Sequence, residues 1–224
     1  MPPKPPDDEG GRRYAGRSPG QRRAERRRRL LDAALELYGT AGYRATPVAQ
    51  VCKAARVAPV KFYEEFAGSE ELIIALSSDI WDPLRKDLLD AMAAAAPSIE
   101  EMSRAGVRAY CHGLLDDPRR ARVLCIEFPT ASPIAERVRR EQIVQFSSLS
   151  FAAFQALTGA RQEQPLGRRQ LAMLANALVG AIDEAIRYWL FEPEPRQPID
   201  DVVETLITVY VAVGTYLVFG APVT

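Results

Sequence analysis

The sequence predicts an all-α protein in which a small N-terminal unit of three helices precedes a larger helical bundle. Apolar residues recur every three or four positions along most of the chain, as on a helix with one buried face. No stretch shows a sustained strand alternation bounded by hairpin turns. Residues 1–66 carry 14 Lys+Arg against 8 Asp+Glu, whereas the remainder of the chain has a net charge of −6. We therefore expect a basic N-terminal unit on an acidic body.

The chain begins with Pro, Gly, Arg and Asp and without apolar periodicity, so residues 1–20 are expected to form a disordered basic tail. The first helix is predicted from Gln21 to an end near Gly39–Gly42, and its first turns hold an arginine-rich run at residues 22–29. Its apolar stripe consists of Leu30, Ala34, Leu37, Tyr38 and Ala41.

Two short helices are predicted next. Thr46 suits an N-cap and Pro47 the first helical position, which predicts a helix over "TPVAQVCKAA". After the turn "RVA", Pro59 begins a second short helix over "PVKFYEEF". Ser69, followed by two glutamates, is expected to cap a longer fourth helix.

The remainder is expected to be helical, interrupted at breaks rich in proline and glycine. The last two helices, over residues 171–189 and 203–217, are apolar on more than one side, so they are expected to form the interface of a homodimer. The predicted domains are the tail, residues 1–20; a helix-turn-helix unit, residues 21–75; and a helical bundle, residues 76–224.

Composition limits the classes of function. With 47% hydrophobic and 26% charged residues, the chain resembles soluble globular proteins. Its most apolar run, residues 206–219, is shorter than the roughly 20 residues that a membrane-spanning helix needs, so no membrane partner is expected. The three cysteines form no C-x-x-C pair and no signal peptide precedes them, which indicates a reducing cytoplasm.

Patterns of catalysis and metal binding are not found in the sequence. It has no nucleophile elbow, phosphate loop or paired catalytic acids, and one histidine leaves little scope for base catalysis, so neither an enzyme nor a cofactor is expected. Cys111 and His112 lie about 100° apart on a helix and have no third ligand at useful spacing, so we reject a metal site. Cys52, Cys111 and Cys125 are expected in the core, with redox sensing as the alternative.

Two short helices joined by a tight turn behind a basic helix form a helix-turn-helix. The run "LLDAALELYGTAGYRATPVAQVCKAARVAPVKFYEEFAGSEELI" resembles the DNA-binding domain of the TetR family of bacterial transcriptional regulators. The matching positions are the apolar first helix, Gly42, Tyr43, Thr46, Val51, Val57, Phe62, Tyr63, Phe66 and Ser69 to Leu72. The resemblance implies a transcriptional regulator, expected to be a repressor, that binds a palindromic operator in double-stranded DNA as a homodimer.

A recognition helix places its first residues in the major groove while neighbouring groups hold the phosphates. Lys61 is expected to contact a guanine or a phosphate, Val60 a thymine methyl group and Tyr63 a phosphate. The arginine run is expected to follow the DNA backbone or enter the minor groove, unless it is merely a solvated helix start. The expected DNA contacts are Arg26, Arg27, Arg44, Thr46, Lys53, Arg56, Val60, Lys61 and Tyr63.

Some positions depart from the family's usual choices. Arg56 stands where glycine is usual, and Ala58 stands where a capping serine or threonine is usual. Lys61 replaces a small or hydroxyl residue, and Glu64 with Glu65 replaces a pair that often contains histidine. Two carboxylates near phosphates are repulsive, so either they face away from the groove or one of them reads a cytosine amino group.

In this family the larger domain dimerises through its last two long helices and binds a small molecule that changes the spacing of the two DNA-reading heads. The resemblance therefore implies a pocket for a partly apolar effector within residues 76–224. The expected ligand contacts are Trp81, Tyr110, Glu127, Phe128, Phe146, Phe151 and Asn176. The alternative is a plain core role for each aromatic residue and a solvated helix face for Glu127.

Two other classes of function remain open. An all-helical enzyme or small-molecule carrier could retain a helix-turn-helix as relic structure. A nucleoid or RNA-binding protein could use the arginine run without sequence preference, in which case its specificity ratio would be near one.

Overall fold

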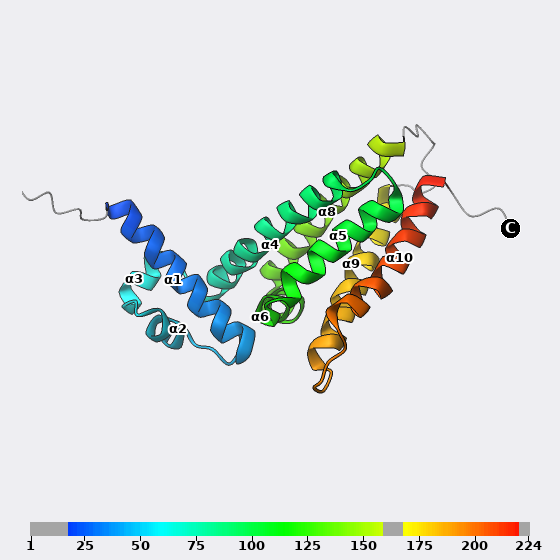
Figure 1. Cartoon of the computed structure of the whole chain (residues 1–224). Helices are drawn as coiled ribbons and strands as arrows, with labels where there is room; N and C mark the ends of the chain where they lie inside the picture. Colours follow the sequence, from blue (N-terminus) through cyan, green and yellow to red (C-terminus); the bar gives the residue numbers. More distant parts are fainter. Residues whose placement is uncertain (1–17, 159–167, 220–224) are drawn as a thin grey trace, which may run out of the picture.

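The computed structural model describes residues 18–158 and 168–219, and every regular element in those ranges is helical, as the sequence predicts (Figure 1). The helices are α1 (Pro19–Thr40), α2 (Val48–Ala55), α3 (Pro59–Tyr63), α4 (Ser69–Ala94), α5 (Ile99–Leu115), α6 (Pro118–Arg122), the π-helical turn η1 (Val123–Glu127), α7 (Phe128–Ala131), α8 (Pro133–Thr158), α9 (Arg168–Phe191) and α10 (Ile199–Phe219). Within the described ranges, no helix is both long and apolar enough to cross a membrane.

Helix α1 begins two residues before the predicted start, so the last residues of the predicted tail are part of the folded unit. Ser18 is its N-cap: the Ser18 hydroxyl accepts from the Gln21 N–H at 3.2 Å, and the Gln21 side chain accepts from the Ser18 N–H at 2.8 Å. Pro19 takes the first helical position. This capping box satisfies two otherwise unpaired donors, which is why the helix starts there.

The predicted N-caps of the second and fourth helices are wrong by one residue each. Pro47 precedes α2 without a side-chain cap, because the Thr46 hydroxyl points back and donates to the Gly42 carbonyl at 2.8 Å. Gly68 is the N-cap of α4, and Ser69 is already helical. The carboxylate of Glu71 accepts from the Ala67 N–H at 2.6 Å and satisfies a donor there instead.

The turn between α2 and α3 explains one departure from the family pattern. Arg56 ends α2 in the left-handed conformation, with φ of 54°. That region favours glycine, because a side chain crowds the backbone there. Ala58 offers no side-chain cap to α3, and Pro59 begins the helix with its backbone already set.

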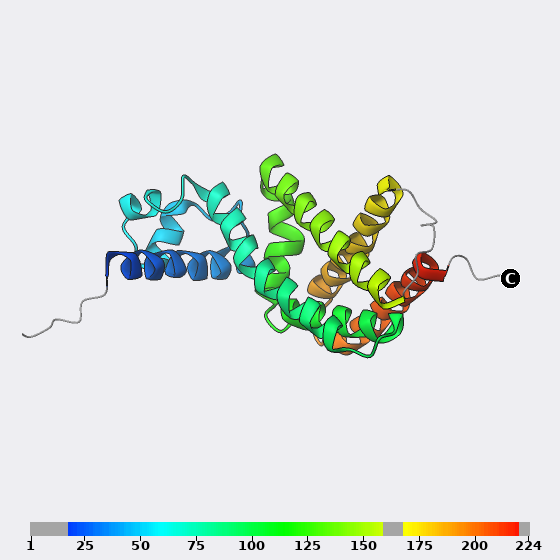
Figure 2. The ribbon, with the colours of Figure 1, turned by 90° about the horizontal axis from the view of Figure 1, so that it is seen from above.

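Helices α1 to α3 gather at one end of the molecule, and α4 leaves them to run along the body (Figures 1 and 2). The buried side chains of Leu30, Tyr38, Phe62 and Phe66 form the centre of the N-terminal unit. In the body, α5 packs between α4 and α10, and the α6 to α7 segment packs against α1. The contacts of α6 and η1 with α1 join the N-terminal unit to the body.

Candidate functional site

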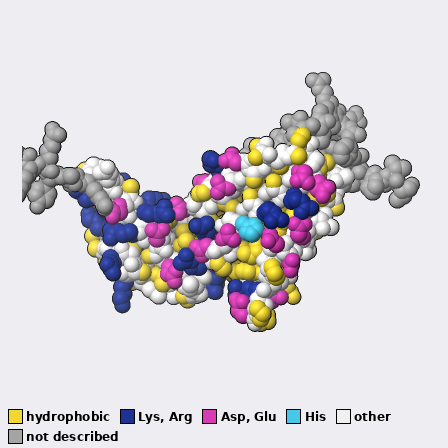
Figure 3. Space-filling model, viewed as in Figure 1, with side chains coloured by type: hydrophobic (Ala, Val, Ile, Leu, Met, Phe, Trp, Pro, Cys, Tyr) yellow, Lys and Arg dark blue, Asp and Glu magenta, His cyan; other side chains and the backbone are white. Residues whose placement is uncertain are grey.

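Helix α3 presents three neighbouring side chains to solvent. Val60 is 68% exposed and Tyr63 60% exposed, and Lys61 lies between them. Phe62, on the opposite face, is fully buried and packs against Phe66 with ring centroids 5.8 Å apart. A five-residue helix has little stability of its own, so these buried rings hold it in place. Figure 3 shows that basic side chains gather over this end of the molecule.

A buried acid lies two residues after Tyr63. Glu65 has a side chain only 1% exposed, and it accepts hydrogen bonds from Arg23 Nε at 3.1 Å and from Arg26 Nη2 at 2.5 Å. Burial by itself would raise the pKa of Glu65, but hydrogen bonds and charge from these two arginines outweigh it and hold the pKa below its ordinary value. The carboxylate therefore joins α1 to the end of α3 and faces away from solvent.

Four of the predicted DNA contacts are held by groups that lie away from the exposed face of α3. Arg26 is bound to Glu65, and the Arg27 guanidinium lies over the Phe66 ring, 4.4 Å from its centroid. Thr46 is buried and donates to Gly42, as described above. Arg44 donates from Nη2 to the Thr130 carbonyl at 3.2 Å, across the junction with the body. The other five predicted residues, which are exposed, are Lys53, Arg56, Val60, Lys61 and Tyr63.

Sequence reasoning left the role of Glu65 open and assigned the arginines to DNA. A signal was present, since Arg23, Arg26 and Arg27 share one side of a helix at spacings of three and four. Their acid lies about 40 positions later in the chain, with separations of 42 and 39 residues for the two bonded arginines. Only the packing of α3 against α1 brings these groups together.

Glu127 was predicted to contact a ligand, and the structure places its carboxylate elsewhere. Oε2 of Glu127 accepts from the Tyr43 N–H at 2.8 Å, and Oε1 accepts from Arg122 Nε at 3.2 Å. Gly42 has a φ of 96°, and a Cβ added to it would come within 3.2 Å of Glu127 Oε1. The carboxylate therefore lies against the turn between α1 and α2 and ties that turn to the body.

Most of the aromatic residues predicted to contact a ligand pack on one another. The Trp81 ring lies edge-on to Tyr110 at 6.4 Å and to Phe146 at 5.6 Å, which joins α4, α5 and α8. Phe128 is buried in the core. Phe151 belongs to α8, but its side chain lies outside the described residues.

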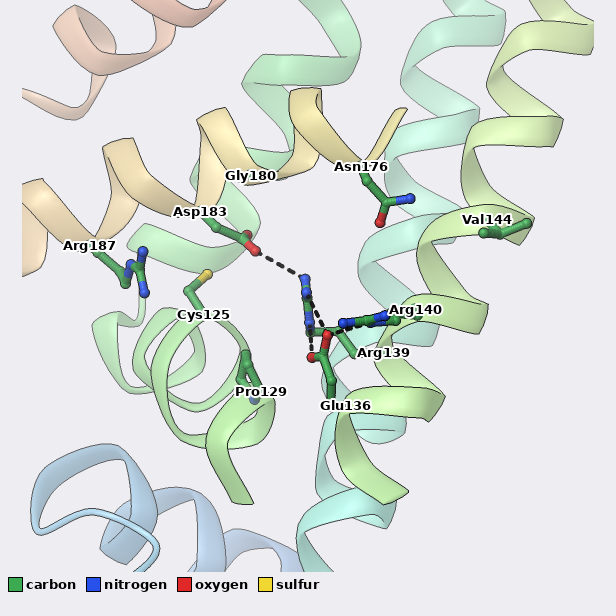
Figure 4. Close-up of a pocket in the computed structure, with 10 residues that line it drawn as sticks. All are labelled: Cys125, Pro129, Glu136, Arg139, Arg140, Val144, Asn176, Gly180, Asp183 and Arg187. Atoms are coloured by element: carbon green, nitrogen blue, oxygen red, sulfur yellow. Dashed lines mark hydrogen bonds and ion pairs between the residues drawn. The ribbon is translucent and has the colours of Figure 1, made fainter. Parts of the chain in front are cut away.

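A pocket of about 560 Å³ opens between α8, α9 and the η1–α7 segment, and it is lined mainly by residues that the sequence did not single out (Figure 4). Asn176 is the predicted ligand residue that lines it. The described lining residues are Cys125, Pro129, Glu136, Arg139, Arg140, Val144, Asn176, Gly180, Asp183 and Arg187. Its volume is in the range of sites for drug-sized molecules.

Charged side chains dominate this pocket. Arg139 donates from Nε to Glu136 at 2.8 Å, and its Nη1 lies 3.5 Å from Asp183 Oδ2 (Figure 4). Arg140 donates to the same Glu136 at 2.7 Å. Burial raises the pKa of Asp183 to about 6, although the charge of Arg139 opposes this. The thiol of Cys125 interacts with Asp183, and burial raises the pKa of that thiol well above its ordinary value.

The remaining titratable residues give no sign of a metal centre. No group of three His, Cys, Asp or Glu side chains suited to a metal ion occurs among the described residues. His112 lies 3.3 Å from Asp116 and 3.4 Å from Asp200, which is an ion pair when the ring is protonated. Cys111, the residue before His112, is buried, and burial raises the pKa of its thiol to about 12.

The last two helices leave large apolar side chains in contact with solvent. On α9, Met173 is exposed, as are Tyr188 and Phe191, which is 72% exposed. On α10, Val209 is exposed as well. Met173, Tyr188 and Phe191 are separated by 15 and 3 residues, so they lie within about 60° of one another around the helix. The face of α9 that holds these three apolar side chains is uncovered, and it also carries the exposed Glu184.

Comparison with known proteins identifies relatives for both parts of the chain. The model of the N-terminal region of bacterial regulatory proteins of the tetR family matches residues 30–76. The transcriptional regulator BetI of Rhizobium meliloti is 36% identical over 78 residues, which are 35% of this chain and 38% of BetI. The transcriptional activator FasR of Mycolicibacterium smegmatis is 26% identical over 187 residues, which are 83% of this chain and 80% of FasR.

Solved structures extend the likeness of fold to the body. The fatty acid degradation regulator FadR from Bacillus halodurans superposes with a TM-score of 0.71 at 18% identity, over 88% of this chain and 96% of that one. The regulator FadR from Bacillus subtilis, solved in complex with stearoyl-CoA, superposes with a TM-score of 0.64 at 18% identity, over 87% of this chain and 99% of that one. At such identities the likeness concerns the fold.

Proposed function

The chain belongs to the TetR family of bacterial regulatory proteins, the ligand-controlled DNA-binding regulators of transcription, and from this premise we propose how it acts. It binds a palindromic operator as a homodimer in the cytoplasm, represses transcription there, and responds to a partly apolar small molecule bound in its body. The observation that carries the proposal is helix α3, whose Val60, Lys61 and Tyr63 stand exposed on a base of buried phenylalanines.

In this proposal fewer residues contact DNA than the sequence suggested. Lys61 and Val60 enter the major groove, Tyr63 donates to a phosphate, and Lys53 and Arg56 supply charge at the flanks. Lys61 Nζ lies 2.7 Å from Glu64 Oε1 in the free protein, and a guanine or a phosphate replaces that partner in the complex. Arg26 and Arg27 stabilise the N-terminal unit instead of contacting DNA.

The apolar face of α9 supports the homodimer. A two-fold interface repeats each of its side chains, so Tyr188 and Phe191 from two copies would cover each other. Two heads that read successive major grooves must stand about 34–36 Å apart. A rigid dimer fixes that separation, and an effector that changes it lowers the affinity for the operator.

The pocket between α8 and α9 is the effector site in this proposal. It lies between helices of the bundle, a common place for ligands, and it touches the η1–α7 segment that contacts α1. The complex of a structural relative with stearoyl-CoA supports an effector with an apolar chain. The fatty-acid regulators among the structural relatives support the same class of ligand.

Selection from a random-site DNA library tests the function. We expect the purified protein to enrich a palindrome whose half-sites are about one helical turn apart, and to bind it at least about 10³-fold more tightly than random DNA. Lys61→Ala should lose most of that preference, whereas Lys86→Ala, an exposed lysine on α4, should keep it. Failure to enrich any sequence, or equal affinity for all sequences, would exclude the proposed regulator and favour a non-specific nucleic-acid-binding protein.

A further inference from the structure

We propose that the pocket between α8, α9 and the η1–α7 segment selects organic molecules that carry an anionic group, and that this group binds Arg139 in place of Asp183. The inference rests on the proposed function for the role of the pocket. The inference specifies the charge of the effector, and it names Asp183 as the residue that the effector displaces from Arg139.

The lining has an excess of positive charge. Three guanidinium groups, those of Arg139, Arg140 and Arg187, and two carboxylates, those of Glu136 and Asp183, line the pocket, and Arg187 also pairs with Glu184 on its own helix. Arg139 lies in the middle of them, reaching toward Asp183 on α9 while its other side is held by Glu136 on its own helix (Figure 4). Guanidinium groups bind carboxylate and phosphate groups in a planar, two-pronged geometry, which suits an anion entering here.

The two partners of Arg139 are not equivalent. Glu136 accepts two hydrogen bonds from it, at 2.8 Å and 3.3 Å, whereas Asp183 lies 3.5 Å away as an ion pair without a hydrogen bond. An incoming anion can therefore take the outer nitrogen of Arg139 from Asp183 at little loss. A cation would have to approach Asp183 past Arg139 and Arg187, and both repel it.

Displacement of Asp183 has a consequence for protons. A second anion beside Asp183 in a buried site cannot be accommodated with both groups charged, so Asp183 takes up a proton on binding. Its pKa of about 6 in the free protein makes this inexpensive near neutral pH. The titratable groups that interact electrostatically with Asp183 are Arg139 and Glu136 on α8, Arg187 on α9, Cys125 on η1, Tyr110 on α5 and Tyr210 on α10, and Cys111 on α5 lies beside Cys125 and Tyr210.

Those neighbours keep their charge state near neutral pH. Burial raises the pKa of both tyrosines and both thiols, so they stay neutral, and hydrogen bonds from the arginines lower the pKa of Glu136, so it stays charged. The bound complex has a higher Asp183 pKa than the free protein. Affinity for the anion must then fall as pH rises above about 6, by up to about tenfold per pH unit.

Calorimetric titration of the whole protein with four ligands of one chain length tests the inference. The ligands are octanoate, octyl phosphate, octanamide and octylamine, so carboxylate, phosphate, neutral and cationic heads are compared on the same chain. We expect at least one of the two anions to bind about tenfold or more tightly than the amide and the amine. We also expect proton uptake, seen as a difference in heat between two phosphate-free buffers that differ in enthalpy of ionisation, such as HEPES and Tris, and the stated loss of affinity with pH.

Asp183→Asn should abolish the proton uptake and the pH dependence, and at about pH 8 it should bind the anion about tenfold or more tightly than the parent chain. Asp201→Asn, at an exposed position on α10, should leave both unchanged. Tightest binding of octylamine, equal binding of all four ligands, absence of binding, or anion affinity that is constant with pH would each overturn the inference. DNA binding without ligand is measured separately, so its loss would count against the proposed function alone.

Discussion

A single buried carboxylate at the end of α3 decides which arginines of α1 are available to DNA. Glu65 binds Arg23, which stays exposed, and Arg26, which is largely buried, and Arg27 stacks on Phe66 beside them. A buried charge needs close opposite charges, and each of these hydrogen bonds involves two ionised groups. Arg23, Arg26 and Arg27 therefore stabilise the packing of the recognition helix against α1.

Removing the charge of that carboxylate should destabilise the fold without touching the exposed face of α3. Glu65→Gln leaves Arg26 facing a neutral amide, and we expect a loss of about 1–3 kcal/mol in the free energy of unfolding, measured by urea denaturation. Glu141→Gln, at an exposed position on α8, should change it by no more than about 0.5 kcal/mol. Equal effects of the two substitutions would contradict a stabilising contact between Glu65 and the arginines of α1.

The same carboxylate should give the fold an acid-sensitive contribution. The pKa of Glu65 is lower in the folded protein than in the unfolded chain, so its stabilisation is complete above the unfolded pKa of about 4.3. The stabilisation is lost as pH falls through the lower folded pKa. The difference in stability between the parent chain and Glu65→Gln should therefore shrink when thermal unfolding is followed from about pH 7 down to about pH 3. A difference that stayed constant with pH would assign the effect to packing.

At the scale of elements, the η1–α7 segment lies between the pocket and the N-terminal unit. Cys125 and Pro129 from this segment line the pocket, while Glu127 binds the Tyr43 amide and the Thr130 carbonyl accepts from Arg44. A π-helical turn often marks a functional position. Residues that line the pocket and residues that contact the N-terminal unit therefore alternate along this segment.

Removing the carboxylate of Glu127 should uncouple the N-terminal unit from the pocket. In Glu127→Ala, we expect the Tyr43 amide to exchange its hydrogen faster, while the buried amides of α1 remain protected. The effect of octanoate or octyl phosphate on operator affinity should shrink as well, by about 1 kcal/mol of coupling free energy. Glu141→Ala, at an exposed position on α8, serves as the control for both measurements. Unchanged exchange at Tyr43 would show that this contact does not hold the turn.

Local rules predicted the helices, and they were least successful at helix ends and at contacts between helices. Apolar spacing predicted the helical elements, since it needs information from one segment at a time. Thr46 looked like an N-cap, but its hydroxyl found a nearer acceptor in the turn before it. The pocket joins Arg139 to Asp183 across two helices, and no local pattern marks such a pair. Aromatic residues were expected there instead, and they fill the core because they bury more apolar area.

At the scale of the whole molecule, the basic surface of the N-terminal unit and the exposed apolar side chains of α9 lie in different parts of the fold. Basic side chains cover the N-terminal unit, and the exposed apolar face of α9 belongs to the body. The charge attracts DNA from any direction, whereas a dimer determines which spacing of half-sites fits. Specific recognition in this arrangement depends both on the N-terminal unit and on α9, which lie in separate parts of the fold.

Placing a charge on the apolar face of α9 should therefore impair specific DNA binding from a distance. Phe191→Glu puts two carboxylates into a two-fold interface, because each substitution acts twice there. We expect a shift toward monomer in sedimentation equilibrium, and a loss of about 10²-fold or more in operator affinity, because one head must then bind without its partner. Ile134→Glu, an exposed apolar position at the start of α8, should leave both properties unchanged. Non-specific affinity at low salt should fall much less, since it depends on the charge of each head. A dimer that persisted in Phe191→Glu would move the interface to another face of the body.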